Sequence, residues 1–329
     1  MNPSLRMPIF IFLLIAIGII AYFNLTYHLT ELRWFWENNQ GEQVNEGFIL
    51  LKEFRLPRVF ISIIAGGGLA ITGMLMQTLF QNPLAGPYVL GINSGSNLFI
   101  GISLLTGIPF LMSEYGMVLT AFIGALLFGL LILLFSTFIK KSISLLLIGL
   151  MISSFTSAIL SILESSSSAN NLKSFVIWGM GSLQKVEFAQ IGFITITFLI
   201  LTLFSLTLMK ALNALVLGET SASALGISVK RERQKIIVIS SLFIGLITAY
   251  CGPIAFVGLT VPNLARILFK TQNHQVLFFA NLLIGSFFLL LCDSIILLLE
   301  PYTAIPINGI TSLIGAPMVI LFILKNGRI

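Results

Sequence analysis

Long apolar runs separated by short polar segments extend over almost the whole chain. Five runs stand alone: Ile9–Tyr27, Met117–Ile139, Leu145–Leu163, Ile191–Met209 and Ile305–Leu324. A helix that crosses about 30 Å of hydrocarbon needs roughly 20 mainly apolar residues. Each of these runs is therefore long enough to form one membrane-spanning helix.

A longer stretch, Val59–Ser113, contains no charged residue and is too long for one helix. Its middle carries Gln81-Asn82-Pro83 and Gly86-Pro87. Proline disfavours helix at the residue before it and removes a backbone donor. The stretch therefore predicts two spans, near residues 57–80 and 89–106.

A second charge-free stretch, Ile236–Ala265, is interrupted at Gly252-Pro253. One span is expected to end near Cys251, and a shorter, irregular one to follow to about Asn263. The run Val276–Leu299 supplies the next span. The pattern as a whole predicts about ten spanning helices.

Composition supports this interpretation. Hydrophobic residues make up 57% of the 329 residues, charged residues only 9%, and mean hydropathy is +1.03. Soluble domains are about a quarter charged, so a soluble enzyme is excluded. Two cysteines cannot form a disulfide scaffold, and the scattered basic residues form no patch for nucleic acid. We expect one all-α, polytopic membrane domain over residues 1–329.

The distribution of basic residues predicts the orientation of this domain. A cytoplasmic N-terminus places 12 of the 18 Lys and Arg residues inside, as the positive-inside rule requires. Both termini and a loop at about 210–235 are then cytoplasmic, and loops at about 28–56 and 164–190 are extracytoplasmic. The first run lacks a small-x-small cleavage site, so we expect it to remain as a span in the cytoplasmic (inner) membrane.

The predicted cytoplasmic loop contains a short capped helix within Gly218–Gly226. Glu219 in its first turn suits the helix dipole, and Gly226 can adopt the left-handed conformation that ends a helix. Because so short a helix is unstable alone, it is expected to pack on something. It is either a docking element for a partner or an ordinary connector on the membrane surface. In the loop 164–190, the run Ser165–Ser168 is typical of a flexible segment.

The spans are almost free of ionisable groups. Asp293 is the only acidic residue well inside an apolar run, and His28 and His274 are expected to be isolated and solvated. The sequence contains no phosphate-binding loop of the Gly-x-x-x-x-Gly-Lys-Ser/Thr type and no catalytic or metal-binding motif. We therefore expect no catalytic residue, cofactor or metal. If the chain moves a solute uphill, a separate subunit must supply the work.

Eight sequence blocks resemble the iron-siderophore and cobalamin permeases of type II ABC importers. They begin with Arg55-Leu56-Pro57-Arg58, Leu69-Ala70-x-x-Gly73, Asn82-Pro83-Leu84-Ala85 and Leu90-Gly91-x-x-Ser94-Gly95. They continue with Trp178-x-x-Gly181-Ser182, Leu215-x-x-Gly218-Glu219-x-x-Ala222-x-x-Leu225-Gly226, Gly252-Pro253-Ile254-x-Phe256-Val257-Gly258 and Pro306-Ile307 with Gly315-Ala316-Pro317. Together they cover the chain from about residue 48 to its end, in the order and spacing of the family.

The resemblance implies a homodimer of ten-span subunits in the membrane lipid, with two cytoplasmic ABC ATPase subunits and a periplasmic or tethered substrate-binding protein. It places four residues in the loop that couples to the ATPase: Glu219, Ala222, Leu225 and Gly226. It also places Arg55 and Arg58 where family members meet acidic residues of the binding protein.

The resemblance also suggests a translocation path along the dimer axis. Ser142 and Ser144 would lie near its cytoplasmic gate, and Met151, Asn308 and Thr311 would face the path. The chain departs from the family at two positions. Leu297 replaces a ninth-span arginine that contacts the binding protein, and Asn263 replaces a histidine.

The resulting hypothesis is a permease subunit for a ferric siderophore or another iron chelate, driven by a separate ATPase. Two alternatives remain at this stage. The cargo could be haem or cobalamin, or the chain could be an ion-coupled secondary carrier with Asp293 as its proton site. A membrane scaffold or intramembrane enzyme is disfavoured, because the sequence offers no nucleophile–base pair.

Overall fold

The computed structural model describes residues 3–27, 49–88, 90–107, 113–139 and 142–326, and within these ranges it contains helices and no strand. The first half of the chain forms α1 (Pro3–Thr26), the π-helix η1 (Leu50–Arg55), α4 (Leu56–Leu79), α5 (Ile92–Thr106), α6 (Glu114–Phe138), α7 (Ser142–Ser166) and α8 (Ala169–Gly179). The second half forms α9 (Phe188–Leu206), α10 (Met209–Leu215), α11 (Glu219–Ala224), α12 (Val229–Cys251), α13 (Val257–Phe269), α14 (His274–Leu299) and α15 (Ile307–Asn326). The predicted all-α class is confirmed.

Eight helices of the described residues are long and apolar enough to cross a membrane. They are α1, η1 continued by α4, α6, α7, α9, α12, α14 and α15. Two shorter helices also belong to the bundle, α5 with 15 residues and α13 with 13. Counting these two, the architecture agrees with about ten spans.

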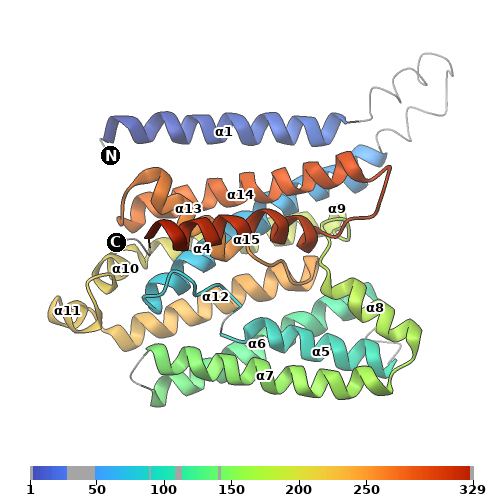
Figure 1. Ribbon diagram of the computed structural model, residues 1–329, viewed down its shortest axis with the longest axis horizontal. Coiled ribbons are helices and arrows are strands. Elements are labelled where there is room, and N and C mark those ends of the chain that lie inside the picture. The colour runs from blue at the N-terminus through green and yellow to red at the C-terminus, as the bar shows by residue number, and fades with distance from the viewer. Residues whose placement is uncertain (1–2, 28–48, 89, 108–112, 140–141, 327–329) are drawn as a thin grey trace.

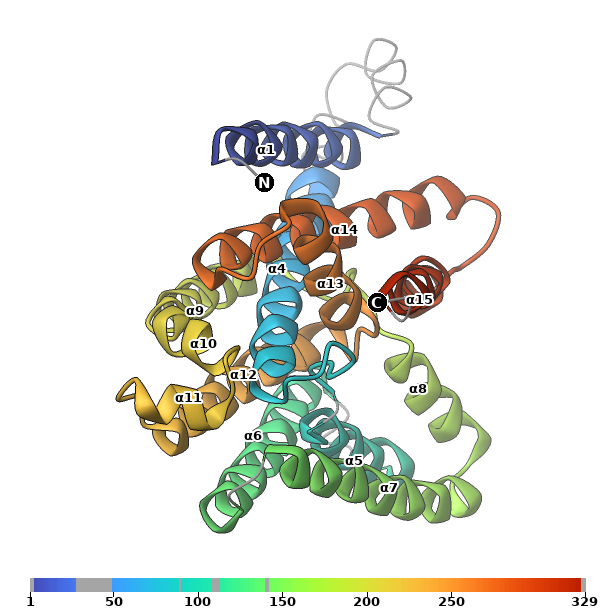
Figure 2. The same ribbon diagram turned by 60° about the vertical axis from the view of Figure 1, so that its left-hand side comes forward.

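Helix α4 lies at the centre of the bundle, and α1 lies at its edge. In the most apolar window of each helix, 89% of α4 is buried but only 11% of α1. Helix α4 packs most extensively on α14, and α1 covers the far side of α14 (Figures 1 and 2). Helices α5, α6 and α7 form a second group, which joins the centre through α12.

The two ends of the bundle carry different short elements. Helices α10 and α11 lie at one end, together with the first turn of α1 and the last turn of α15 (Figure 1). We call this the α11 end. The opposite end, which carries η1 and the last turns of α14, is called the η1 end. Both described termini of the chain therefore lie on the same side of the bundle.

Glycines allow α4 to approach its neighbours closely. A Cβ atom on Gly66 would overlap the carbonyl oxygen of Gly285 in α14, and one on Gly73 would overlap that of Gly258 in α13. In lipid, helix association depends on such packing because the hydrophobic effect between helices is absent. The glycines of α4 therefore set the spacing of the central helices.

The predicted chain breaks are confirmed with small shifts. Helix α4 ends at Leu79, directly before the Gln81-Asn82-Pro83 break, and α12 ends at Cys251, directly before Gly252-Pro253. The shorter span that follows continues to Phe269, beyond the predicted end near Asn263. Pro262 lies in the second turn of this helix and has no N–H, so the carbonyl of Gly258 lacks the intrahelical donor that another residue at position 262 would supply.

The loop predicted at 164–190 is largely helical, and the expectation of a flexible serine run was wrong. Helix α7 continues to Ser166, and Ser168 caps α8 by accepting a hydrogen bond from the backbone N–H of Asn171 at 3.3 Å. A serine is a favourable N-cap, so the same residue type that disfavours a helix interior begins one here. Residues 28–48 of the other predicted external loop, including His28, lie outside the described residues.

We expect Gly73→Ala to lower the free energy of unfolding by about 1–3 kcal/mol, because the added methyl group forces α4 away from α13. Gly18→Ala is the matched control, since a Cβ there meets nothing within 4 Å. Melting of the two detergent-solubilised variants measures the difference. Equal melting temperatures would contradict the close packing of α4 on α13.

Candidate functional site

The short helix α11 is built as the sequence predicts. Gly218 precedes it with φ +100°, Glu219 occupies its first turn, and Gly226 follows it with φ +80°. The backbone N–H groups of Ile227 and Gly226 donate to the carbonyls of Ala222 and Ser223 at 3.0 Å each, which is the Schellman pattern of a helix end. Both ends of α11 are thus closed by backbone conformations that glycine favours.

The four predicted coupling residues face different surroundings. Ala222 is fully buried against the bundle, whereas Leu225 is 63% exposed beyond the end of the helix. Gly226 has no neighbour that a Cβ would meet within 4 Å. Glu219 turns toward the bundle. An exposed apolar leucine beside an accessible glycine turn offers a surface against which another protein can pack.

Glu219 contacts residues from two other helices. Its Oε1 accepts hydrogen bonds from the hydroxyl of Ser142, the first residue of α7, and from Arg233 Nη2 in α12 at 3.1 Å. Arg233 also donates from Nη1 to the carbonyl of Ile139, at 2.8 Å, at the end of α6. The structure therefore joins one predicted coupling residue to one predicted gate residue, through an arginine that sequence reasoning missed.

Helix α10 is attached to the central helices by a separate set of contacts. Gln81 Nε2 donates to the carbonyl of Leu215 at 2.9 Å. Asn213 Oδ1 accepts from both the backbone N–H and the Nδ1 of His274, at 2.8 and 2.9 Å. Because an amide oxygen only accepts, Nδ1 carries the proton, and Nε2 is left to accept from the Thr78 hydroxyl at 2.8 Å.

The expectation that His274 is solvated was wrong, because the residue is 1% exposed. Its position at the start of an apolar helix gave no indication of the partners, which come from residues 78 and 213. The histidine joins the end of α4, the start of α14 and α10. It is a structural residue at the base of the α11 end.

The predicted path residues do not gather in one place. Ser144 and Met151 lie on the exposed side of α7, and Met151 is 63% exposed. Asn308 holds chain turns together, since its amide donates to the carbonyl of Pro253 at 2.7 Å and its Oδ1 accepts from the N–H of Ala255 at 2.8 Å. Thr311 is fully buried in α15.

Asn263, whose effect the sequence left undefined, also holds chain segments together. Its side-chain amide donates to the carbonyls of Pro83 and Leu259, at 2.9 Å each. Its Oδ1 accepts from Arg266 Nη1 at 3.1 Å. Asn263 therefore fastens the break after α4 to helix α13.

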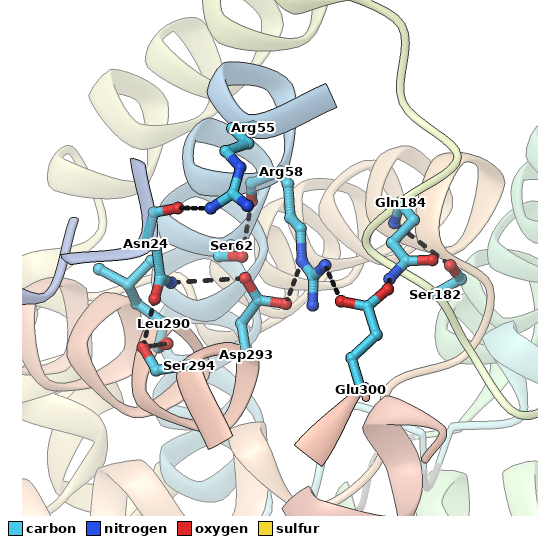
Figure 3. Close-up of polar contacts among 10 residues, drawn as sticks. All are labelled: Asn24, Arg55, Arg58, Ser62, Ser182, Gln184, Leu290, Asp293, Ser294 and Glu300. Atoms are coloured by element: carbon cyan, nitrogen blue, oxygen red, sulfur yellow. Dashed lines mark hydrogen bonds and ion pairs between the residues drawn. The ribbon is translucent and has the colours of Figure 1, made fainter. Parts of the chain in front are cut away.

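At the η1 end, a polar network joins helices that are distant in sequence (Figure 3). Arg58 Nε in α4 donates to Asp293 Oδ1 in α14 at 2.8 Å. Asp293 is 2% exposed, and its other oxygen accepts from the side-chain amide of Asn24 in α1 at 3.5 Å. The only acid predicted inside an apolar run is therefore partnered by one of the two predicted docking arginines.

The network continues toward solvent. Arg58 Nη1 lies 3.6 Å from Glu300 Oε2, and Glu300 is 51% exposed. Gln184 Nε2 donates to Glu300 Oε1 at 3.4 Å, which brings the segment after α8 into the network (Figure 3). Arg58 thus has a buried partner on one side and an accessible partner on the other.

Arg55 lies at the end of η1 and is less constrained. Its guanidinium donates to the backbone carbonyl of Asn24 at 2.9 Å. A cavity of about 340 Å³ lies beside it, lined by Arg58, Glu300 and Leu297 among others. Leu297, where the resemblance led us to expect an arginine, is one of the residues that line this cavity.

The helical bundle has the permease fold of type II ABC importers, since it matches a solved transporter of that kind over nearly its whole length. The model of the FecCD transport family matches residues 9–325. The chain belongs to the FecCD transport family, and the resemblance drawn from the sequence blocks is confirmed.

Relatives and a solved structure support this assignment over nearly the full length. The hemin transport system permease protein HmuU of Yersinia pestis is 30% identical over 96% of this chain and 95% of its own. The molybdate import system permease protein MolB of Haemophilus influenzae is 35% identical over 84% and 81%. An inward-facing structure of a metal-chelate type ABC transporter has a TM-score of 0.85 and is 31% identical, covering 97% of this chain and 99% of that one.

The chain is accordingly a multi-pass membrane protein and a permease subunit of an ABC importer, not an enzyme. Permeases of such importers work with an ATPase and with a substrate-binding partner. The α11 end and the η1 end are therefore the two places where partner contacts are to be sought.

We expect Asp293→Ala to lower the free energy of unfolding by about 3–5 kcal/mol, because it leaves the Arg58 charge without its buried partner. Glu300→Ala removes the exposed partner of Arg58 and is expected to change the free energy of unfolding by less than about 1 kcal/mol. The double variant Arg58→Met/Asp293→Leu should regain most of the loss, since it removes both charges. Urea or thermal unfolding in detergent measures all three. A single variant at 293 as stable as the parent would exclude a buried pair of this strength.

Proposed function

We propose that this chain is the transmembrane subunit of an ATP-driven importer that carries a ferric siderophore or a similar iron chelate across the cytoplasmic (inner) membrane. It works as a homodimer with two ABC ATPase subunits and a substrate-binding protein. The α11 end, with the loop at about 210–235 and both termini, faces the cytoplasm. The η1 end, with the segments at about 28–56 and 164–190, faces outward.

The observation that carries the proposal is the construction of α11. A helix of six residues is unstable by itself, yet here it is closed at both ends and attached through Glu219 and Ala222. The exposed surface near Leu225 and Gly226 is left free for a partner. Since the sequence has no phosphate-binding loop, a separate ATPase that docks there supplies the work.

The transport step follows from the two sets of contacts that join the α11 end to the rest of the bundle, one through Glu219 and one through α10. ATP binding and hydrolysis move the ATPase subunits relative to one another, and α11 moves with the ATPase surface on which it docks. Helices joined to α11 then tilt, which opens the path on one side and closes it on the other. We place the path along the dimer axis beside α7 and α15, with Ser142 and Ser144 near its cytoplasmic gate. Met151, Asn308 and Thr311 would lie along the path in the dimer.

A metal held in a chelate is favoured as cargo by two of the similar proteins, since one carries hemin and another is of a metal-chelate type. Another similar protein is named for molybdate import, so an oxyanion belongs in the comparison. The ion-coupled carrier is not favoured. Its one candidate proton site, Asp293, is held in an ion pair with Arg58 at 2.8 Å.

We expect vesicles that contain the permease, its ATPase and its binding protein to accumulate a ferric siderophore only with ATP on the ATPase side. Vesicles with the permease alone should accumulate none, and an uncoupler of the proton gradient should have no effect. Hemin, cobalamin and molybdate form the comparison panel. Accumulation by the permease alone under an ion gradient would refute the importer, and preference for another cargo would refute the siderophore.

At the η1 end, Arg55 and Arg58 are proposed to receive acidic residues of the binding protein. An incoming carboxylate competes with Glu300, which holds Arg58 from the accessible side at 3.6 Å. Such charge pairs orient the encounter and fix its register.

Arg55→Ala should raise the Kd of the loaded binding protein about tenfold, which corresponds to about 1.4 kcal/mol. The matched control is Lys173→Ala, which removes an exposed cation from α8 outside the network. Surface plasmon resonance at low and high salt measures both. Similar Kd values for the two variants would argue against docking at Arg55.

A further inference from the structure

One arginine differs from the basic residues around it at the start of α12. Lys230, Arg231 and Lys235 are exposed, and Lys235 pairs with Glu232 at 2.7 Å within the same helix. Arg233 is 3% exposed and is directed into the bundle. A buried cation costs several kcal/mol unless it is paired and hydrogen-bonded, so its contacts must compensate for its burial.

The Arg233 guanidinium joins α12 to two other helices, and Glu219 adds a third. Nη1 donates at 2.8 Å to the carbonyl of Ile139, which caps the C-terminal end of α6. Nη2 donates at 3.1 Å to Glu219, in the first turn of α11. The same carboxylate oxygen accepts from Ser142, the first residue of α7.

The charges of Arg233 and Glu219 each have the sign that the dipole of the neighbouring helix end favours. The guanidinium meets the negative end of the α6 dipole, and the Glu219 carboxylate lies at the positive end of α11. Charge-assisted hydrogen bonds of this kind are about twice as strong as neutral ones. Only arginine presents several donors in a rigid plane, so a lysine could not reach both acceptors in the same geometry.

The link is distinct from the other attachment of the α11 end. Through α10, Gln81 and His274 join this end to α4 and α14, the central pair. Through Glu219 and Arg233 it joins the ends of α6 and α7, which belong to the group formed with α5. Figures 1 and 2 show these ends of α6 and α7 on the same side of the molecule as α11.

We propose that Arg233 is the positioning residue that transmits displacement of α11 to the α6–α7 corner. This inference rests on the proposed ATPase docking at α11. When the ATPase moves α11, the Glu219–Arg233 pair pulls on the carbonyl end of α6, and the Ser142 hydroxyl draws the start of α7 in the same direction. Helices α4 and α14 are driven separately through α10. Without Arg233, the ATPase still docks and hydrolyses ATP, but the α5–α7 group no longer follows.

The test uses the complete complex in vesicles and measures transport and ATP hydrolysis together. Arg233→Met should leave the ATPase bound and active and lower the number of cargo molecules carried per ATP by about tenfold. Arg233→Lys should lower it less, since it keeps the charge but loses the fork. Arg231→Met is the control, because it removes an exposed cation of the same loop. An unchanged transport-to-hydrolysis ratio in Arg233→Met, or an equal loss in Arg231→Met, would overturn the proposal.

A charge exchange addresses the case in which Arg233→Met fails to fold. Glu219→Arg and Arg233→Glu alone should each abolish coupled transport, and the double variant Glu219→Arg/Arg233→Glu should restore part of it. If Glu219 instead acts by direct contact with the ATPase, the double variant stays as inactive as Glu219→Arg, which contradicts the proposal. Failure of the proposed function itself is recognised in the parent complex, where ATPase binding or ATP dependence would be missing.

Discussion

Helices α4 and α14 approach so closely that the carbonyl of each glycine in the Gly66–Gly285 pair occupies the space of a Cβ on the other. The hydroxyl of Ser286 donates to the carbonyl of Ile63 at 2.8 Å across the same contact. Small residues and a satisfied polar group are what lipid-embedded helices need in order to associate. Since the contact is tight at mid-length, the two helices stay in register at both ends. The charged pair at the η1 end and the histidine at the α11 end both depend on this register.

The polar groups of the bundle are arranged by what burial permits. Asp293 is tolerated because Arg58, 235 residues away in sequence, lies within hydrogen-bond distance. A buried pair of this kind adds little net stability, because desolvation offsets most of the attraction. Its consequence is specificity, since only one alignment of α4 and α14 satisfies both charges. The partly exposed Glu300 extends the same pair to the surface, where a partner can reach it.

The spans, the breaks and the short helix α11 could be predicted because each has a local cause. Apolar runs of sufficient length, prolines and glycines act on their immediate neighbours, as at Gly252-Pro253. Features that depend on distant partners could not be predicted. The sequence contains both Arg58 and Asp293 but not their contact, and nothing near His274 indicates that it is buried. Helix α8 was missed for a different reason, since serine favours both turns and helix caps.

The two attachments of the α11 end have different physical properties. The attachment through α10 consists of neutral hydrogen bonds around His274. This residue is buried, and both of its ring nitrogens and its backbone N–H are hydrogen-bonded within the protein. The attachment through Glu219 is a charged contact whose acid is 36% exposed, so solvent or a partner can compete for it. In the transport cycle proposed above, a motion that starts at α11 reaches α4 and α14 through these hydrogen bonds, whereas its transmission to α6 and α7 depends on whether the Glu219–Arg233 ion pair stays closed. Under that proposal, α4 with α14 and the α5–α7 group respond to the same displacement by different amounts, which is the relative motion that the proposed alternating path requires.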